Sequence, residues 1–301
     1  MASNSITAQR PKFSMVIKSD VYQKLIKQTL GDPKKAERYT AAIMSAVATN
    51  SQLQQCEART ILSGSLLAES LGLAHSPQLG QYYLVPFENR KQGVFEAQFI
   101  LGYKGYLQLA IRSGNYKKIN VMEIKEGELV SFNPFDEEIV LKPIQDVDER
   151  EDAETIGYYA MFEYTNGFRK TIYWSKKKML KHADQYSAAF SINATSGKYP
   201  KVSYEDYVAG RYDKKKDGWL YSSYWYKDFD GMAKKTMLRQ LISKWGIMSV
   251  DMQQAFTFDN AVTDLSPDGS FEVEVPNEPE TIGNEAPEQA NESGVVSIDE
   301  L

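Results

Sequence analysis

The sequence contains very little cysteine or histidine. Among its 301 residues, Cys56 is the one cysteine, and His75 and His182 are the two histidines. This scarcity excludes an internal disulfide framework and a cysteine-based zinc site, and it leaves little for a metal site built on imidazoles. We therefore expect Cys56 to be structural and His75 to be a hydrogen-bonded loop residue.

Long apolar runs are also missing. No run approaches the roughly 18 residues that a membrane-spanning helix needs. The N-terminal residues 1–13 are polar and have no apolar signal-peptide region. We expect a soluble, intracellular protein without membrane contact, and its 42% apolar and 12% aromatic residues are enough for a sizeable core.

The motifs of nucleotide-dependent and metal-dependent enzymes are absent or incomplete. The segment Gly231–Thr236 approaches a phosphate-binding loop, but it lacks the second glycine and falls inside a predicted helix. Asp228 and Asp230 form the nearest carboxylate pair in the basic part of the chain, with Glu205 and Asp206 before them. Because residues at i and i+2 on a helix face apart, a metal-dependent nuclease is the weaker alternative. The sequence indicates no catalytic residue, no metal ligand and no required cofactor.

Charge is distributed unevenly along the chain. After Lys244 there is no Lys or Arg, and 13 of the 40 acidic residues lie in that last part. Residues 1–244 therefore hold 35 basic and 27 acidic residues, a net charge of +8, although the whole chain has −5. A basic body with an acidic tail is typical of a protein that binds a polyanion. The tail could compete for the same surface or simply increase solubility.

Periodicity predicts an α+β fold with N-terminal helices, a central antiparallel β-sheet with a hairpin arm packed on helices, and a disordered acidic C-terminal tail. Start and stop residues predict helices over 20–30 and 33–50, since Asp32-Pro33 is a typical helix start. Further helices are expected at 54–71, 176–186, 223–244 and 249–257, and a short amphipathic helix within 98–119 is expected to open at Lys104. We divide the chain into an N-terminal arm and helices (1–50), a core (51–258) and a tail (259–301).

Strands are indicated where the period changes to two. We expect a hairpin from 82–87 and 94–101, strands near 117–124, 128–132 and 138–143, and an acidic linker over 146–154. Asn166-Gly167 between two alternating segments is a strong hairpin signal. Residues 187–222 have no sustained period and are expected to form a long loop, and residues after about 260 are expected to be disordered.

Lysines interleaved with aromatic residues recur in four segments, at 103–118, 168–178, 212–227 and 234–245. Such a pattern suits single-stranded nucleic acid, because cations hold phosphates and aromatic rings stack on bases. Any one segment could instead be a solvated face with half-buried tyrosines. Four segments together favour a nucleic-acid groove.

Four motifs resemble those of the RecT family of phage and prophage single-strand annealing proteins, which are related to Redβ. They are YYLVPF (82–87), LGYKGYLQLAIRSGNYKKI (101–119), EGEL (126–129) and MAKKTMLRQLISKWG (232–246). The resemblance covers roughly residues 50–255. It implies an ATP-independent recombinase of the bacterial cytoplasm that binds single-stranded DNA, anneals complementary strands and promotes strand invasion.

The resemblance also implies rings or helical filaments, a core fold like that of eukaryotic annealing proteins, a partner exonuclease, and contact of the C-terminal region with the host single-strand-binding protein. Mg²⁺ is expected only as a counterion of DNA. A passive module that binds single-stranded DNA without annealing it is a further alternative. We consider the hairpin arm, the first helices and the 187–222 segment as candidate subunit contacts.

We predict that single-stranded DNA lies extended in a basic groove, which leaves its base edges free for a second strand. The predicted phosphate contacts are Lys104, Arg112, Lys117, Lys118, Arg169, Lys170, Lys234, Lys235 and Arg239. The predicted stacking residues are Tyr103, Tyr106, Tyr116, Phe168 and Trp225.

Overall fold

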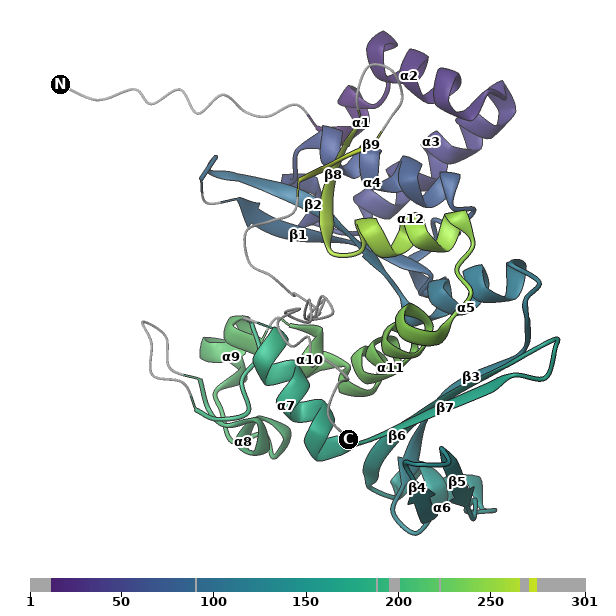
Figure 1. Ribbon diagram of the computed structural model, residues 1–301. Coiled ribbons are helices and arrows are strands. Elements are labelled where there is room, and N and C mark those ends of the chain that lie inside the picture. Colours follow the sequence, from purple (N-terminus) through teal and green to yellow (C-terminus); the bar gives the residue numbers. More distant parts are fainter. Residues whose placement is uncertain are drawn as a thin grey trace, which may run out of the picture.

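The protein has an α+β fold, as the sequence predicts. A computed structural model describes residues 12–89, 91–187, 189–194, 201–221, 223–265 and 271–274. Helices and antiparallel sheets form two packed groups, and one long helix passes between them (Figure 1). The predicted arm up to residue 11 and the predicted tail from residue 275 lie outside the described residues.

The N-terminal helices form a layer over the first sheet. They are α1 (Phe13–Val16), α2 (Asp20–Leu30), α3 (Pro33–Ala48), the 3-10 helix η1 (Leu53–Gln55) and α4 (Ala58–Ser70). The Asp32 side chain accepts a hydrogen bond from the Lys34 amide at 2.8 Å, which confirms the predicted helix start. The helix predicted over 54–71 is shorter and begins only at Ala58. α4 is buried along most of its length because α3 packs on one side and the first sheet on the other.

The first sheet has the order β1-β2-β8-β9. Its strands are β1 (Tyr82–Asn89), β2 (Val94–Leu101), β8 (Ala261–Leu265) and β9 (Phe271–Glu274), and another short 3-10 helix, η2 (Pro77–Leu79), precedes them. β8 and β9 fall in the segment that the sequence predicts to be disordered, so that prediction is wrong for these strands. Val262 and Thr263 are buried because β8 pairs with β2 and packs on α4.

The second sheet has the order β3-β6-β7. Its strands are β3 (Tyr116–Lys125), β6 (Thr155–Tyr164) and β7 (Arg169–Ser175), and the separate hairpin β4–β5 consists of Leu129–Asn133 and Glu138–Leu141. Side chains alternate along β6, so Tyr158 and Phe162 face one helical layer while Tyr159 and Met161 face the β4–β5 hairpin. The Asn-Gly hairpin is confirmed, and the expected strands divide between separate sheets.

Two segments predicted to be irregular contain helices. The acidic linker forms α6 (Val147–Asp152), whose first turn is capped by the Asp146 side chain. After α7 (Lys176–Tyr186), the expected loop contains α8 (Tyr204–Val208), α9 (Lys214–Asp217) and the 3-10 helix η3 (Gly218–Tyr221). These short helices are held by tyrosine packing rather than by a helical sequence period; the rings of Tyr207 and Tyr221, for example, lie 4.9 Å apart.

The central helix is α11 (Phe229–Trp245). The sequence predicts one helix over 223–244, but Asp228 (φ −147°, ψ 71°) separates α11 from α10 (Tyr224–Lys227). Leu238 and Ile242 pack with α5 (Tyr103–Arg112) and α12 (Val250–Phe258). Met237 and Leu241 pack on the second sheet and on α7. α11 therefore joins the two groups, and within the described ranges no helix is long and apolar enough to cross a membrane.

Candidate nucleic-acid interface

A buried ion cluster centres on Asp259, directly after α12. Its carboxylate accepts hydrogen bonds from the Leu101 amide (2.9 Å), the Tyr106 hydroxyl (2.8 Å), Lys235 Nζ (3.1 Å) and an Arg239 guanidinium nitrogen (2.5 Å). Burial alone raises the pKa of Asp259, but the charges of Lys235 and Arg239 hold it below the ordinary value. The cluster ties α5 and α11 to the strand that follows α12.

This cluster changes the expected roles of three residues. Lys235 and Arg239 are predicted phosphate contacts, but their side chains are only 9% and 19% exposed and both neutralise Asp259. Tyr106 is completely buried, and its hydroxyl lies between Asp259 and Arg239. Tyr106 therefore has no free ring face for a base, and its assignment as a stacking residue is withdrawn.

Trp225 is also a core residue. It is 4% exposed and lies 5.3 Å from the ring of Phe229 in the aromatic cluster beneath α10. In the one-turn helix α10, Trp225 and Tyr226 both face inward, while Tyr224 is 47% exposed. The assignment of Trp225 as a stacking residue is therefore withdrawn too.

Two glycines place Tyr103 and Lys104 at the start of α5. A Cβ at Gly102 or Gly105 would lie 2.1 Å from the carbonyl oxygen of Gly80 or Gln81, so only glycine permits this close approach. The Gly102 amide donates to the Gln81 carbonyl at 2.9 Å. The first turn of α5 is thus fixed beside the chain that enters β1, and Lys104 is exposed there.

Around this turn lies a surface that we call the tyrosine–lysine cluster. Its members are Tyr83, Tyr103, Lys104, Tyr224, Lys227 and Lys234. The rings of Tyr83 and Tyr224 are 6.2 Å apart, Lys227 Nζ is 5.9 Å from the Tyr224 ring, and Lys234 Nζ is 5.5 Å from the Tyr103 ring. Burial raises the pKa of Tyr83, and Tyr224, Asp228 and Tyr103 raise it further.

Half of this cluster is absent from the predicted set. The sequence does not predict Tyr83, Tyr224 and Lys227 as members of the site, because they lie on β1 and α10, far in sequence from the start of α5. The motif Tyr-Trp-Tyr-Lys at residues 224–227 combines aromatic rings with a lysine, and it is the sequence signal that could have indicated Tyr224 and Lys227. Lys234 also forms an ion pair with Glu123 at 3.3 Å, so one carboxylate lies at the border of the cluster.

A second group of predicted residues lies at the far end of β3, β6 and β7. It consists of Tyr116, Lys117, Lys118, Phe168, Arg169 and Lys170. Lys117 pairs with Glu163 at 2.6 Å, and Lys170 pairs with Glu137 and lies 3.4 Å from the centre of the Trp245 ring. Phe168 is 48% exposed and stacks on Tyr164 at 5.8 Å.

The two groups are separated along α11. Lys234 borders the tyrosine–lysine cluster and Trp245 borders the second group, so they are about 16 Å apart at 1.5 Å per helical residue. Tyr116 is half-buried and donates its hydroxyl to the Ile247 carbonyl at 3.1 Å. Arg112 lies apart from both groups and joins Gly72 to Asp251. The structure therefore does not gather all predicted residues into one groove.

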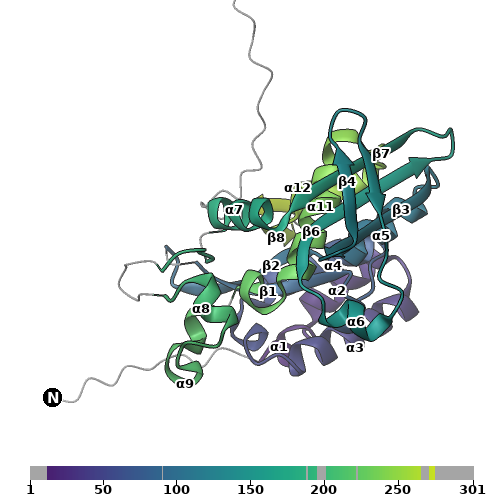
Figure 2. The same cartoon turned by 90° about the horizontal axis from the view of Figure 1, so that it is seen from below.

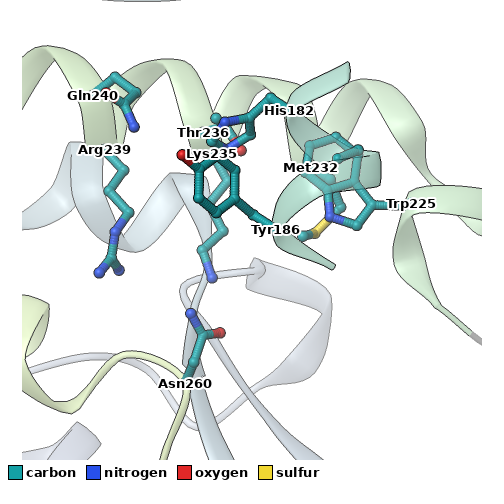
Figure 3. A pocket seen from close by; sticks show the side chains of 10 residues that line it. His182, Tyr186, Trp225, Met232, Lys235, Thr236, Arg239, Gln240 and Asn260 are labelled. Carbon is teal, nitrogen blue, oxygen red and sulfur yellow. The ribbon is translucent and has the colours of Figure 1, made fainter. Parts of the chain in front are cut away.

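A small pocket lies between α7, α11 and the residue before β8. Figure 3 shows Lys235 extending from α11 toward Asn260, with His182 and Tyr186 of α7 beside it. Its volume of ≈ 40 Å³ has room for a few water molecules and is too small for a nucleotide base. Burial, with a contribution from Lys178, lowers the pKa of His182 to about 4.

The carboxylates of the nuclease alternative have structural partners. Asp228 accepts a hydrogen bond from the Gly231 amide at 2.9 Å and caps α11, and Asp230 accepts one from the Tyr158 hydroxyl at 2.5 Å. In the part of the chain that the structure describes, no three His, Cys, Asp or Glu side chains are grouped to hold a metal ion. Cys56 is buried, and burial raises its pKa to about 12. His75 is hydrogen-bonded to Tyr82 and Glu69.

Comparison with known proteins gives one family and two relatives. The model of the RecT family matches residues 37–274. "Uncharacterized protein YqaK" of Bacillus subtilis is 38% identical over 232 residues, which are 77% of this chain and 66% of that protein. "Protein RecT" of Escherichia coli is 26% identical over 227 residues, 74% of this chain and 71% of that protein. The match includes both groups of candidate residues.

Proposed function

The chain belongs to the RecT family, and from this premise we propose that it is a single-strand DNA annealing protein of homologous recombination. It binds single-stranded DNA as an oligomer and pairs the bound strand with a complementary one. The energy comes from base pairing, so no nucleotide hydrolysis is required. The family match over residues 37–274 is the observation that carries this proposal.

The tyrosine–lysine cluster supports a binding mode for the DNA. Tyr224 presents an exposed ring, and Lys104 and Lys227 are exposed beside it. Cations of this kind neutralise phosphates, and an exposed tyrosine ring stacks on a base whatever its sequence. We place the start of the DNA path at this cluster and its continuation along α11 toward Phe168, Arg169 and Lys118. Lys117 and Lys170 would join it on release from their carboxylate partners.

The proposal includes an assembly and partners. The protein forms rings or helical filaments on DNA in the bacterial cytoplasm, receives single strands from an exonuclease, and contacts the host single-strand-binding protein. Mg²⁺ acts only as a counterion of the DNA. Family membership is the support for each of these statements.

An annealing assay without nucleotide tests the proposal. Two complementary oligonucleotides, one of them labelled, are mixed with the full chain at constant salt, and duplex formation is followed over time. We expect annealing many times faster than without protein, and no change when ATP is added. Binding without acceleration would indicate a passive binding module. Mg²⁺-dependent degradation of the labelled strand would indicate a nuclease.

A further inference from the structure

An acidic projection stands out from the basic body of the protein. Residues 126–154, which we call the acidic knob, contain eleven acidic and two basic residues, a net charge of −9. The remainder of residues 1–244 therefore has a net charge of +17. The knob comprises β4, β5 and α6 and covers one face of the second sheet through residues such as Leu129 and Ile139. A charge of this sign repels DNA, so the knob has another role.

The outer surface of the knob exposes several apolar side chains. Phe135 at the tip of the β4–β5 hairpin is 93% exposed, Val130 62%, Val140 42% and Val147 on α6 69%. Exposed apolar side chains surrounded by charge are typical of protein-binding surfaces.

The knob is a rigid part of the fold. The side chain of Glu128 is 4% exposed and pairs with Arg150 at 2.7 Å. Its carboxylate also accepts hydrogen bonds from the Lys125 amide at 2.8 Å and the Ile144 amide at 3.4 Å. Arg150 in turn donates to the Glu123 carbonyl at 3.0 Å. Because this network fixes α6 to the sheet, the knob presents a preformed surface and loses little conformational freedom on binding.

A segment with a row of exposed lysines lies across the sheet. Residues 204–221, which we call the lysine lobe, comprise α8, α9 and η3. Lys214, Lys215 and Lys216 are exposed in a row, close in sequence to Trp219, which is 58% exposed. Asp213 caps α9 by accepting from the Lys215 and Lys216 amides, so this carboxylate is directed at the backbone. Residues 204–221 hold four basic and four acidic residues, but Glu205 and Asp206 pair with Arg211. The cations that the lobe presents are therefore the three lysines, close in sequence to an exposed Trp219.

The knob and the lobe lie on opposite faces of the second sheet. The knob packs on the face with Tyr159 and Met161, whereas Tyr204, Tyr207 and Tyr212 belong to the aromatic cluster on the face with Tyr158. Figure 1 and Figure 2 show α6 and β4 on one side of the molecule and α8 and α9 on the other. A contact between such surfaces is heterologous, so it repeats from copy to copy and builds a ring or a filament.

We propose that the acidic knob of one copy docks on the lysine lobe of the next copy of this chain. The inference rests on the self-association in the proposed function and names the two surfaces that would produce it. A second copy is the occupant that fits, because the complementary charge and exposed apolar side chains are both present on this chain. The contact involves no residue of the tyrosine–lysine cluster.

Charge reversal in two separate variants tests the contact. The knob variant carries Glu138→Lys, Asp148→Lys and Glu151→Lys, and the lobe variant carries Lys214→Glu, Lys215→Glu and Lys216→Glu; all six side chains are exposed. The control variant carries Lys177→Glu, Lys181→Glu and Lys244→Glu, which are exposed and lie outside the knob, the lobe and the candidate subunit contacts, with the same change in net charge as the lobe variant. Full-length proteins are compared without DNA by sedimentation velocity at low and high salt.

We expect wild-type protein to self-associate more strongly at low salt, and each knob or lobe variant to need an at least tenfold higher concentration, which is about 1.4 kcal/mol. An equimolar mixture of the two variants restores association, because the reversed knob then meets the reversed lobe. The control variant behaves like wild type. A wild-type protein that stays monomeric, unchanged variants, or a mixture without rescue would each overturn the contact.

The same proteins separate this inference from the proposed function. If wild type anneals DNA but mixing the knob and lobe variants does not restore self-association, the knob–lobe contact is rejected and the annealing function stands. If the mixture restores self-association but wild type does not anneal DNA, the contact stands and the annealing function is rejected. Self-association that the knob variant leaves intact would mean that the knob serves a different, basic protein, and this outcome also overturns the proposal.

Discussion

Lys235 Nζ lies 3.1 Å from the carboxylate of Asp259, whose side chain is completely buried. The two residues are far apart in sequence and join the middle of α11 to the end of α12. Arg239, one helical turn after Lys235, reaches the other oxygen of the same carboxylate. Lys235 and Arg239, which the sequence predicts to bind phosphate, therefore have a counter-ion inside the protein. Substitution of Asp259 should change the stability of the fold.

Replacing Asp259 by Asn should destabilise the fold by about 3 kcal/mol, because two partly buried cations would lose their compensating charge. The measurement is urea unfolding of the variant and wild type at neutral pH. Lys117→Ala is the matched control, since Lys117 and Glu163 form a solvent-screened surface pair that should contribute little to stability. Equal effects of the two substitutions would show that the Asp259 cluster does not stabilise the fold.

Stability should fall as the pH is lowered from about 6.5 toward 4. Burial lowers the pKa of both His75 and His182, the latter to about 4. The folded state thus prefers neutral imidazoles, so their contribution is complete above the unfolded pKa of about 6.5 and is lost as protons bind. For His182 the loss should be about 2 kcal/mol after allowance for partial exposure.

The chain has only these two histidines, which gives the experiment an internal control. Unfolding is measured from pH 7.5 to 4.5 for wild type, His182→Gln and the double variant His75→Gln, His182→Gln. Above about pH 5.5, where the carboxylates are ionised in both states, the pH dependence should become smaller with the first substitution and close to flat with both. A His182→Gln variant with the full wild-type slope would contradict the proposed burial of a neutral imidazole.

The tyrosine–lysine cluster should bind phosphates through its three lysines, of which Lys104 and Lys227 are exposed and Lys234 is half-buried. Replacing Lys104, Lys227 and Lys234 by Ala should weaken binding of single-stranded DNA and reduce the salt slope by about 2, at roughly 0.7 per lost phosphate contact. Affinity is measured by fluorescence anisotropy at several salt concentrations. The matched control replaces Lys24, Lys27 and Lys34 by Ala, and an equal loss in that control would mean that only net charge matters.

Stacking on Tyr224 has a separate test. Tyr224→Ala should weaken binding by about 1–3 kcal/mol, whereas Tyr224→Phe retains the ring face and should bind almost like wild type. Both variants are compared on oligonucleotides of equal length and different sequence, since stacking tolerates any base. A loss with Phe as large as with Ala would assign the effect to the hydroxyl group.

The sequence predicts most elements of this fold because their signals are local. Asp32-Pro33 marks the start of α3, and Asn166-Gly167 marks the turn between β6 and β7. β8 escapes such an analysis because its five residues are stabilised by pairing with β2, more than 150 positions earlier. The same limit applies to the candidate site. Lysine at position 235 is equally compatible with DNA and with a buried carboxylate, and only Asp259 decides between them.

The break at Asp228 shows how local rules compete. Asp228 ends α10 and caps α11, so Tyr224 and Lys227 turn toward Tyr83 instead of continuing the face of α11. A prediction of one continuous helix through Asp228 misses this change of direction. The cluster around Tyr83 is therefore visible only when β1, α5 and α10 are placed together in three dimensions.

Truncation should separate the folded end of the chain from the acidic sequence after it. A chain ending at Glu274 retains β8 and β9, and we expect it to fold and to anneal DNA like the full chain. A chain ending at Phe258 lacks Asp259 and β8, so Lys235 and Arg239 lose their counter-ion and α4 loses the buried contacts of Val262 and Thr263. Its free energy of unfolding should fall by several kcal/mol, measured by urea unfolding, and its annealing should be lost. Full annealing by the shorter chain would show that β8 is dispensable, whereas loss of annealing at Glu274 without a change in stability would assign the acidic sequence a direct part in the reaction.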